Sequence, residues 1–360
     1  MPLCLSKILR SIYSSLCSTS DSYSPSQTPL PSRHFDAFPL LQLPLVAMEH
    51  VLCMMNPFEL IDVSLASSRA KTAVKNFSKT QKKFSVLFSV GGPSISLTRE
   101  QMKWLYRLSS SEEEAGFLAY IYPYHNILNR ENLVINVSKE PLKDIMKWFD
   151  YVKEVLNCQI DNVSFKLLPS SLENRRTTDW IAAQNSMVNE MEISNNVENL
   201  NDDVKYIMER IHVTGSLNLS IWKYKEDFRM EIPGKPYHLH INNSKFIDYD
   251  QLLRLKSPVI ILRQSILTSQ EINRFLKSWM SCETHLELEA LKISISGPDA
   301  MNEIMDLPHE KTNDPELVEA FKSSPHHIQV KTEMFTIKRC DGKKRATVVQ
   351  DRSTLYLLVH

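Results

Sequence analysis

Short stretches in which apolar and polar residues alternate recur along the chain from residue 133 onward. A period of two is typical of β-strands that bury one face. These stretches span residues 133–137, 163–167, 191–193, 217–221, 239–241, 260–262, 291–295 and 335–337. Many of the intervals between them show the helical spacing of apolar residues instead, namely 142–156, 178–187, 204–211, 249–255, 271–280 and 315–321. The pattern therefore predicts a chain that alternates strands with helices.

The predicted strands are regularly spaced, with most centres roughly 20–30 residues apart, as in repeat proteins. A unit of one strand and one helix cannot bury its own apolar face, so such units stack on their neighbours. We therefore predict an α+β/α/β fold in which residues 79–360 form an irregular leucine-rich-repeat-like strand–helix solenoid. Its curved sheet should be mainly parallel, with right-handed crossovers and helices on the outer side. Strands 217–221, 239–241 and 260–262 should be parallel neighbours. No L-x-x-L-x-L-x-x-N consensus recurs, so the number and curvature of the repeats stay open.

Two successive units have similar sequences around their predicted helix starts. Asp248 and Thr268 each stand at an N-cap position, and Gln251 and Glu271 follow three residues later. A divergent repeat explains this match. The spacing of a capping box, in which two side chains satisfy each other's backbone N–H groups, explains it equally without common ancestry.

Residues 38–78 show three short helical patterns with clear start signals. The first follows Pro44, and proline suits an opening turn because its missing N–H needs no partner there. The second begins at Asn56-Pro57, with Glu59 placed for a capping box. The third runs over about 68–77. A unit of this size is too small to bury all its apolar residues, so some of them should face a partner or the next domain.

This segment resembles a known family. F-P-L-L-x-L-P, then V-L, then N-P-x-E-L-I-x-x-S-L-A-S-x-R occur in order over residues 38–74. The set is similar to an F-box, the small helical module that docks onto the Skp adaptor of cullin-based ubiquitin ligases. An ordinary helical hairpin that caps a larger domain is the alternative. The resemblance implies an adaptor-binding surface formed by Leu43, Pro44, Val51, Leu52, Met55, Pro57, Leu60, Ile61, Ser64, Leu65 and Arg69.

A second resemblance covers residues 227–291 and, more weakly, 142–342. F-R-M-E-I-P, N-S-K-F-I, I-I-L-R-Q-S-I-L-T and E-I-N-R-F-L-K-S-W-M resemble the type 2 F-box-associated domain, which accompanies F-boxes in a family greatly expanded in nematodes. Asp341-Gly342, at the end of the weaker match, also indicates a tight hairpin turn. The two modules in this order imply a substrate-receptor subunit of an SCF-type ubiquitin ligase. The alternative is a non-catalytic repeat scaffold with no role in a ligase.

The composition of the chain indicates which binding partners and which cellular compartment to expect. The 42 basic and 42 acidic residues cancel, so no net charge favours nucleic acid or an anionic membrane as a partner. Six cysteines without a C-x-x-C pair favour a reducing compartment, which we expect to be cytoplasmic and/or nuclear. No run of 18 apolar residues is present. Residues 1–37, rich in Ser and Pro, are expected to be a disordered leader; a targeting presequence is the alternative.

No catalytic constellation is evident, so we expect neither an enzyme nor a cofactor. His238-x-His240 places two imidazoles on one side of a strand, and His326-His327 follows later, but no third ligand has metal-site spacing with them. Gly91-Gly92-Pro93-Ser94 lacks the Lys of a P-loop, and no G-x-S-x-G is present.

The polar alternates of the predicted strands define a candidate target-binding strip. Because the apolar residues of each strand face the helices, the residues between them face the open side of the sheet. Such a mixed polar strip suits protein recognition better than a small-molecule pocket; a plain solvated sheet surface is the alternative. Its members are Lys166, Glu192, Asn218, Ser220, His238, His240, Asn242, Ile261, Arg263, Lys292 and Ser294.

Overall fold

The computed structural model describes residues 40–124, 127–195, 200–225, 227–297, 299–324, 328, 330 and 332–360. The predicted leader at 1–37 and the pair His326-His327 lie outside the described residues. The chain divides into two compact units. Unit 1 comprises Met1–Phe88 and Gly92–Gln159, and unit 2 comprises Ser89–Gly91 and Ile160–His360. The F-box region therefore shares a compact unit with the strands and the helix that follow it.

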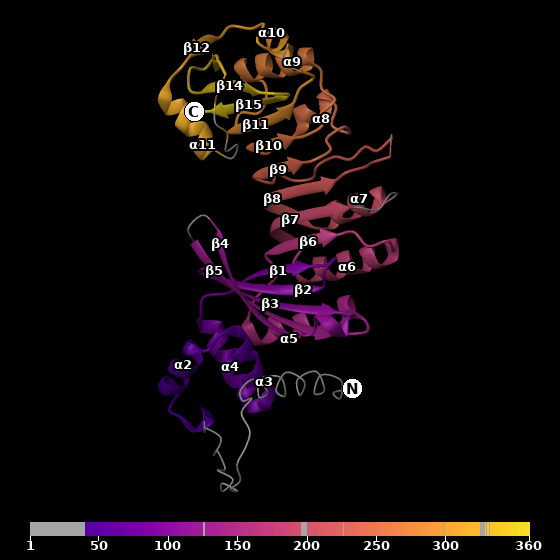
Figure 1. Ribbon diagram of the computed structural model, residues 1–360, viewed down its shortest axis with the longest axis vertical. Helices are drawn as coiled ribbons and strands as arrows, with labels where there is room; N and C mark the ends of the chain where they lie inside the picture. Colours follow the sequence, from indigo (N-terminus) through magenta and orange to yellow (C-terminus); the bar gives the residue numbers. More distant parts are fainter. Residues whose placement is uncertain are drawn as a thin grey trace, which may run out of the picture. The chain divides into compact units, whose positions relative to one another are not determined.

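Unit 1 begins with the three helices that the sequence predicts, α2, α3 and α4 (Figure 1). Asn56 caps α3 as expected: its side chain accepts a hydrogen bond from the Glu59 N–H at 3.1 Å, and the Glu59 carboxylate accepts one from the Asn56 N–H at 2.8 Å. Ser67 caps α4 in the same way by accepting from the Ala70 N–H. The helical elements of unit 1 are η1 (Leu40–Gln42), α2 (Leu45–Met54), α3 (Pro57–Ala66), α4 (Ser68–Thr80), η2 (Glu112–Glu114) and α5 (Pro141–Leu156).

The sheet of unit 1 is mixed, so the predicted parallel repeat is wrong for this part of the chain. Its strands lie in the order β1-β2-β3-β5-β4. β2 pairs with β3 and β4 pairs with β5 in antiparallel fashion, whereas β3 and β5 are parallel. Only two residues separate β2 from β3, and Glu100 takes a left-handed φ of 59° there. So short a link permits only an antiparallel partner, because a parallel one needs a long crossover. The strands are β1 (Ser85–Ser89), β2 (Ser94–Arg99), β3 (Met102–Ser109), β4 (Gly116–Tyr124) and β5 (Ile127–Val137).

Six strands of unit 2 form the predicted parallel array. They run side by side in chain order from β6 to β11 (Figure 1), and each is parallel to the next. The parallel pairing predicted for 217–221, 239–241 and 260–262 is confirmed. The strands are β6 (Asn162–Lys166), β7 (Met187–Asn195), β8 (His212–Ile221), β9 (His238–Ile241), β10 (Val259–Leu262) and β11 (Ala290–Ser294).

Helices occupy four of the five connections between these strands: α6 (Ser171–Gln184), α7 (Asn201–Arg210), α8 (Tyr249–Arg254) and α9 (Ser269–Met280). The described residues between β8 and β9 contain neither helix nor strand. Asp248 and Thr268 cap α8 and α9 through the predicted capping boxes. The alternation of burial along the strands follows the sequence pattern: Leu217, Leu219 and Ile241 are fully buried, and the polar residues between them are not.

The C-terminal part of unit 2 departs from the parallel array. β11 is followed in the sheet by β15, β14, β13 and β12, all antiparallel to their neighbours. The predicted strand at 335–337 therefore belongs to a hairpin and not to a repeat. Gly342, with a φ of 69°, forms the predicted turn between β13 and β14. The elements are α10 (Ala300–Ile304), β12 (Glu310–Thr312), α11 (Pro315–Ser323), β13 (Met334–Lys338), β14 (Arg345–Asp351) and β15 (Thr354–Val359).

The coarse fold class is thus confirmed: a helical N-terminal region precedes a mixed α/β region with a long sheet. Within the described residues, no helix combines the length and apolar character that crossing a bilayer requires.

Candidate functional site

Helix α2 presents an apolar surface to solvent. Leu45, Val46 and Met54 are 64%, 65% and 78% exposed, and Cys53 beside them is exposed as well. α2 is mostly apolar apart from Glu49 and His50, and Leu52 is its single buried residue. Single exposed apolar side chains are common on soluble proteins, whereas several on one short helix indicate a docking site. We call Leu45, Val46, Cys53 and Met54 the α2 patch.

The residues predicted to bind an adaptor include exposed, partly buried and fully buried side chains. Pro44 and Arg69 are exposed, and Leu43, Val51, Met55 and Leu65 are partly buried. Leu52, Pro57, Leu60, Ile61 and Ser64 are buried within unit 1, so these side chains hold the helices together and do not form a surface. Sequence reasoning missed all four members of the α2 patch: Leu45, Val46, Cys53 and Met54. The available signal was that a short helix made mostly of apolar residues cannot bury all of them.

Aromatic contacts hold α3 against β3 and α5. The Phe58 ring meets the Tyr106 ring edge to face with centroids 4.5 Å apart, and Tyr106 meets Trp148 at 5.6 Å. Burial, and after it the Asp62 carboxylate, raise the pKa of Tyr106 well above its usual value, so its hydroxyl stays neutral. The hydroxyls of Ser64 and Tyr151 share a hydrogen bond of 2.9 Å.

Ion pairs attach α4 to the same helix. Lys71 and Lys75 both contact the Glu154 carboxylate of α5, at 2.7 and 3.2 Å. Lys71 also lies 4.7 Å above the Tyr151 ring. Because α3 and α4 pack on β3 and α5 in this way, the helical region belongs to one compact unit with them, and this unit presents the α2 patch.

The predicted target-binding strip occupies successive strands of unit 2 in register. One row across β6 to β11 consists of Ser164, Glu192, Asn218, His240, Ile261 and Lys292, each opposite the next, and it continues to Tyr356 on β15. His238 lies one row earlier, opposite Ser216 and Val259. The six predicted strip residues on β7 to β11 that belong to these rows are therefore brought together on one face.

A second row follows the carboxyl ends of the strands. Lys166 lies opposite Ser194, and Ser194 lies opposite Ser220. The Asn242 amide donates to the Ser220 hydroxyl at 2.9 Å, which extends the row past β9. Arg263 follows β10, and Ser294 on β11 lies opposite Thr354 on β15. Sequence reasoning missed Ser164, Ser194, Thr354 and Tyr356; the last two come from an antiparallel strand that the periodicity did not reveal.

Exposure varies along the strip. Lys166, Glu192, His238 and Arg263 are exposed, whereas Asn218, Ser220, His240, Asn242, Ile261, Lys292 and Ser294 are partly buried. The strip is therefore a polar surface with recessed positions, and Ile261, Lys292 and Ser294 lie at its β10–β11 end.

This end of the strip holds a pocket of about 350 Å³ with a positive character. Its lining is Trp222, Asn242, Leu262, Arg263, Gln264, Lys292, Ser294, Thr354 and Tyr356. Lys292 lies 5.0 Å above the Tyr356 ring. Among the described residues, no carboxylate lies within ion-pair distance of Arg263 or Lys292, although Asp351 is close enough to act on Lys292. We call Arg263 and Lys292 the cationic end of the strip.

Burial and neighbouring positive charges lower two pKa values at and beside the cationic end. Burial, and then the Arg263 guanidinium, lower the pKa of Lys292. Burial followed by the charges of Arg263 and Lys292 lowers the pKa of His240, against a weaker effect of the Asn242 side chain. Concentrated positive charge of this kind is relieved when an anionic group binds. Within the described chain, no group of three His, Cys, Asp or Glu side chains is placed to hold a metal ion.

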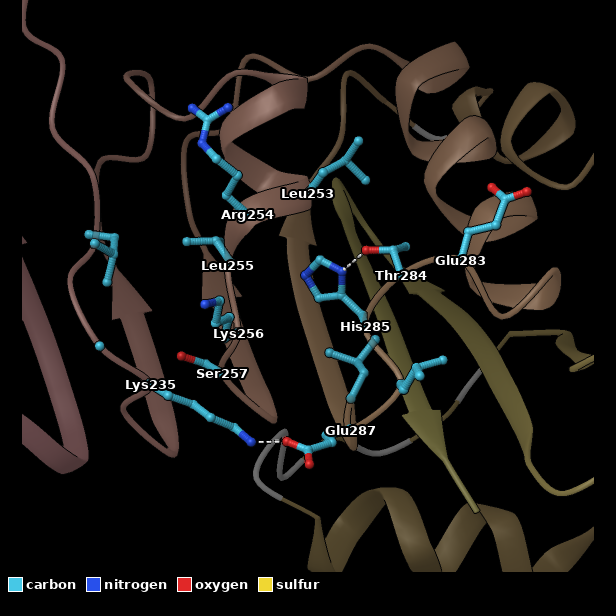
Figure 2. Close-up of a pocket in the computed structure, with 14 residues that line it drawn as sticks. Lys235, Leu253, Arg254, Leu255, Lys256, Ser257, Glu283, Thr284, His285 and Glu287 are labelled. Atoms are coloured by element: carbon cyan, nitrogen blue, oxygen red, sulfur yellow. Dashed lines mark hydrogen bonds and ion pairs between the residues drawn. The ribbon is translucent and has the colours of Figure 1, made fainter.

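A larger pocket of about 690 Å³ opens among the loops that precede β9, β10 and β11. Figure 2 shows His285 in its wall, where its Nδ1 and the Thr284 hydroxyl share a hydrogen bond of 2.6 Å. Lys235 and Glu287 form an ion pair at the rim (Figure 2). Burial lowers the pKa of His285 to about 4, so this imidazole is neutral and packs edge to face on Phe275.

Two family models match segments of the chain. Residues 40–82 match the F-box domain, and residues 228–293 match the F-box associated family. The chain therefore carries an F-box followed by an F-box-associated domain, as the sequence resemblance implied. The first match covers α2 to α4, and the second covers β9, β10 and most of β11 with the cationic end. No curated protein and no solved structure matches the chain.

These matches define a general class. F-box domains generally bind Skp adaptors and through them a cullin, and F-box proteins are generally non-catalytic adaptor subunits of ubiquitin ligases. An F-box joined to an F-box-associated domain suggests, in general terms, a substrate-receptor role.

Proposed function

We propose that this chain is the substrate-receptor subunit of a cullin-based, SCF-type ubiquitin ligase, acting in the cytoplasm and/or the nucleus. The F-box binds the Skp adaptor and through it a cullin, while unit 2 binds a protein target. Other subunits perform the transfer of ubiquitin. The contribution of this chain is proximity, because a held target meets the conjugating enzyme at a high effective concentration.

The single observation that carries the adaptor role is the exposed α2 patch on a helix inside the F-box match. Leu45, Val46 and Met54 are apolar, together on one helix and more than half exposed. Burial of such side chains stabilises an interface, at about 25 cal/mol for each Å² removed from water. We place Leu43, Pro44, Val51, Met55, Leu65 and Arg69 at the edge of this interface, because they are exposed or partly buried.

The target-binding role rests on the polar strip of unit 2. We propose that β6 to β11 with their helices form a leucine-rich-repeat-like solenoid, whose strip is the docking face. The parallel, in-register neighbours support this proposal. The cationic end adds chemical selectivity: a target segment that carries carboxylate or phosphate groups complements Arg263 and Lys292.

Reconstitution with the ligase subunits tests the proposal. We expect the full chain, co-expressed with a Skp adaptor, to elute as one stoichiometric complex on size-exclusion chromatography and to recruit a cullin only when the adaptor is present. An F-box-deleted chain lacking α2 to α4 is unsuitable as a control, because α3 and α4 pack on α5. Elution of the soluble, folded chain apart from the adaptor would instead favour a scaffold outside the ligase.

A further inference from the structure

Two cysteines far apart in the sequence meet at one edge of unit 2. Cys282 follows α9, and Cys340 follows β13, and 58 positions separate them. Their sulfur atoms lie 3.3 Å apart, with the Cys340 thiol donating to Cys282 Sγ. This pair could not be predicted from the sequence, because its spacing matches no C-x-x-C motif and the contact arises only where the segment after β13 lies beside the end of α9.

The backbone holds the two residues in register. The Cys340 N–H donates to the carbonyl of Met280 at 2.7 Å, so the segment after β13 is tied to the last turn of α9. Cys282 has a left-handed φ of 63°, a conformation that favours Gly or Asn after a helix. Cys340 is exposed and Cys282 is partly exposed, so a small reagent can reach both sulfur atoms.

Arg339 distinguishes the two thiols electrostatically. Its Nε and Nη2 each donate to Cys282 Sγ at 3.5 Å, and Nη2 also contacts the Asp341 carboxylate at 3.0 Å. Arg339 is only 8% exposed, and its Nη1 donates to the Leu286 carbonyl at 3.3 Å, so the guanidinium is fixed. Hydrogen bonds from Arg339, and then from Cys340, lower the pKa of the Cys282 thiol. The contact with Cys282 raises the pKa of Cys340.

The roles of the two sulfur atoms follow from this asymmetry. A thiolate and not a thiol reacts with peroxides, and a neighbouring arginine increases the thiolate fraction. A second thiol in contact can then resolve the oxidised product. A sulfur–sulfur separation of 3.3 Å needs only a modest side-chain movement to reach the bonded length of about 2.05 Å.

We propose that Cys282 and Cys340 form a peroxide-reactive dithiol, in which Cys282 is the site of oxidation and Cys340 is the resolving thiol. The Cys282 thiolate attacks a hydroperoxide, the O–O bond breaks, and the products are a sulfenic acid at Cys282 and water or an alcohol. The Cys340 sulfur then attacks Cys282 Sγ, the S–O bond breaks, and water leaves with the Cys340 proton. Two electrons pass from the sulfur atoms to the peroxide, and a thiol reductant reverses the change.

The disulfide would restrain a loop that lines the larger pocket. The segment from Glu283 to Leu288 forms one wall of the large pocket in Figure 2, and it begins at the residue after Cys282. Both ends of the cross-link lie in unit 2, and Cys282 lies inside the F-box-associated match. This dithiol does not depend on the proposed ligase role.

Peroxide titration of the full chain tests the proposal, with Cys53 as an internal control because it is another exposed free cysteine. After limited hydrogen peroxide, alkylation and peptide mapping should reveal a peptide linked through Cys282 and Cys340 that dithiothreitol separates. Cys282 should be consumed faster than Cys53, because the hydrogen bonds from Arg339 lower the pKa of the Cys282 thiol and so increase its thiolate fraction. Equal rates of consumption, or oxidised Cys53 without the linked peptide, would overturn the proposal.

Two serine variants assign the roles. In the Cys340→Ser variant, oxidation should stop at a sulfenic acid on Cys282, which dimedone traps. In the Cys282→Ser variant, Cys340 should react with peroxide no faster than Cys53. A fast-reacting Cys340 in the Cys282→Ser variant would contradict the assignment. If either variant fails to fold, the pH profile of iodoacetamide alkylation of the wild-type chain decides: the midpoint at Cys282 should lie below the value of about 8.5 for a free cysteine, and a midpoint at or above it would contradict the proposal.

Discussion

His285 makes the stability of unit 2 depend on pH. Its folded pKa of about 4 lies below the ordinary value of 6.5 because the ring is buried. The neutral ring therefore contributes stability that is complete above about pH 6.5 and is lost as the pH falls toward 4. Between pH 7 and pH 5 the loss should be about 2 kcal/mol in the free energy of unfolding.

The variant His285→Asn isolates this effect. Asn tolerates the left-handed φ of 48° at this position and carries no titrating group. Urea unfolding at pH 7 and pH 5 should therefore show a smaller loss of stability in the variant than in the wild-type chain, by about 2 kcal/mol. An identical pH dependence in both chains would show that His285 does not titrate as its burial predicts.

Arg263 and Lys292 should select acidic target segments. We expect a chain with Arg263→Gln and Lys292→Gln to lose about tenfold or more in affinity for peptides rich in Asp, Glu or phosphoserine, because both cations that line the pocket are removed. Peptides with Ser and Asn at those positions should bind both chains equally weakly. Binding to a peptide array measures the difference.

A matched variant controls for the loss of charge. Lys245→Gln with Lys277→Gln removes two exposed cations of unit 2 outside the strip and should leave acidic-peptide binding unchanged. If both double variants lost acidic-peptide affinity equally, net charge would explain the loss, and the cationic end would have no specific role in binding.

At the scale of elements, local signals were predictable and strand partners were not. The caps at Asn56, Asp248 and Thr268 depend on residues three positions apart, so the sequence alone specifies them. The direction of β2 against β3 and of β13 against β14 depends on short turns at Glu100 and Gly342, and only the second carries the Asp-Gly signature. Alternation alone cannot separate a repeat strand from a hairpin strand.

Among the site residues too, those set by local pattern were predictable and those set by packing were not. The strip residues Asn218, His240 and Lys292 were predictable because a period of two fixes their face and the parallel register aligns them. The exposed part of the F-box region was not predictable, because Leu52 and Met54 are both apolar and only packing decides that one is buried and the other exposed. The Cys282–Cys340 contact required the whole antiparallel end of unit 2.

The cap of α3 gives a prediction at this scale. Asn56→Ala removes the acceptor of the Glu59 N–H and should lower the free energy of unfolding of unit 1 by about 1 kcal/mol. Asn56→Ser retains a capping oxygen and should cost only a few tenths of that. Thermal or urea unfolding followed by Trp104 and Trp148 fluorescence measures both. Equal stability of the Ala and Ser variants would show that the capping bond contributes nothing.

For the molecule as a whole, the proposed roles are divided between the two compact units. Unit 1 contains the F-box and presents the α2 patch, and its own strands and α5 stabilise the helices behind that patch. Unit 2 contains the F-box-associated match, the strip and the dithiol. Variants at the α2 patch should therefore leave peptide binding and peroxide reactivity unchanged, so each activity can be tested alone.

The central claim, that the α2 patch binds the Skp adaptor, is tested most directly by an equilibrium binding measurement on two exposed-residue variants. Leu45→Glu with Met54→Glu alters side chains that contribute little to folding, because both are exposed. Leu172→Glu is the matched control, since Leu172 is 59% exposed on α6 of unit 2. We predict that the first variant loses at least about 100-fold in adaptor affinity and that the control keeps wild-type affinity. Wild-type affinity in a folded Leu45→Glu, Met54→Glu chain would contradict the account.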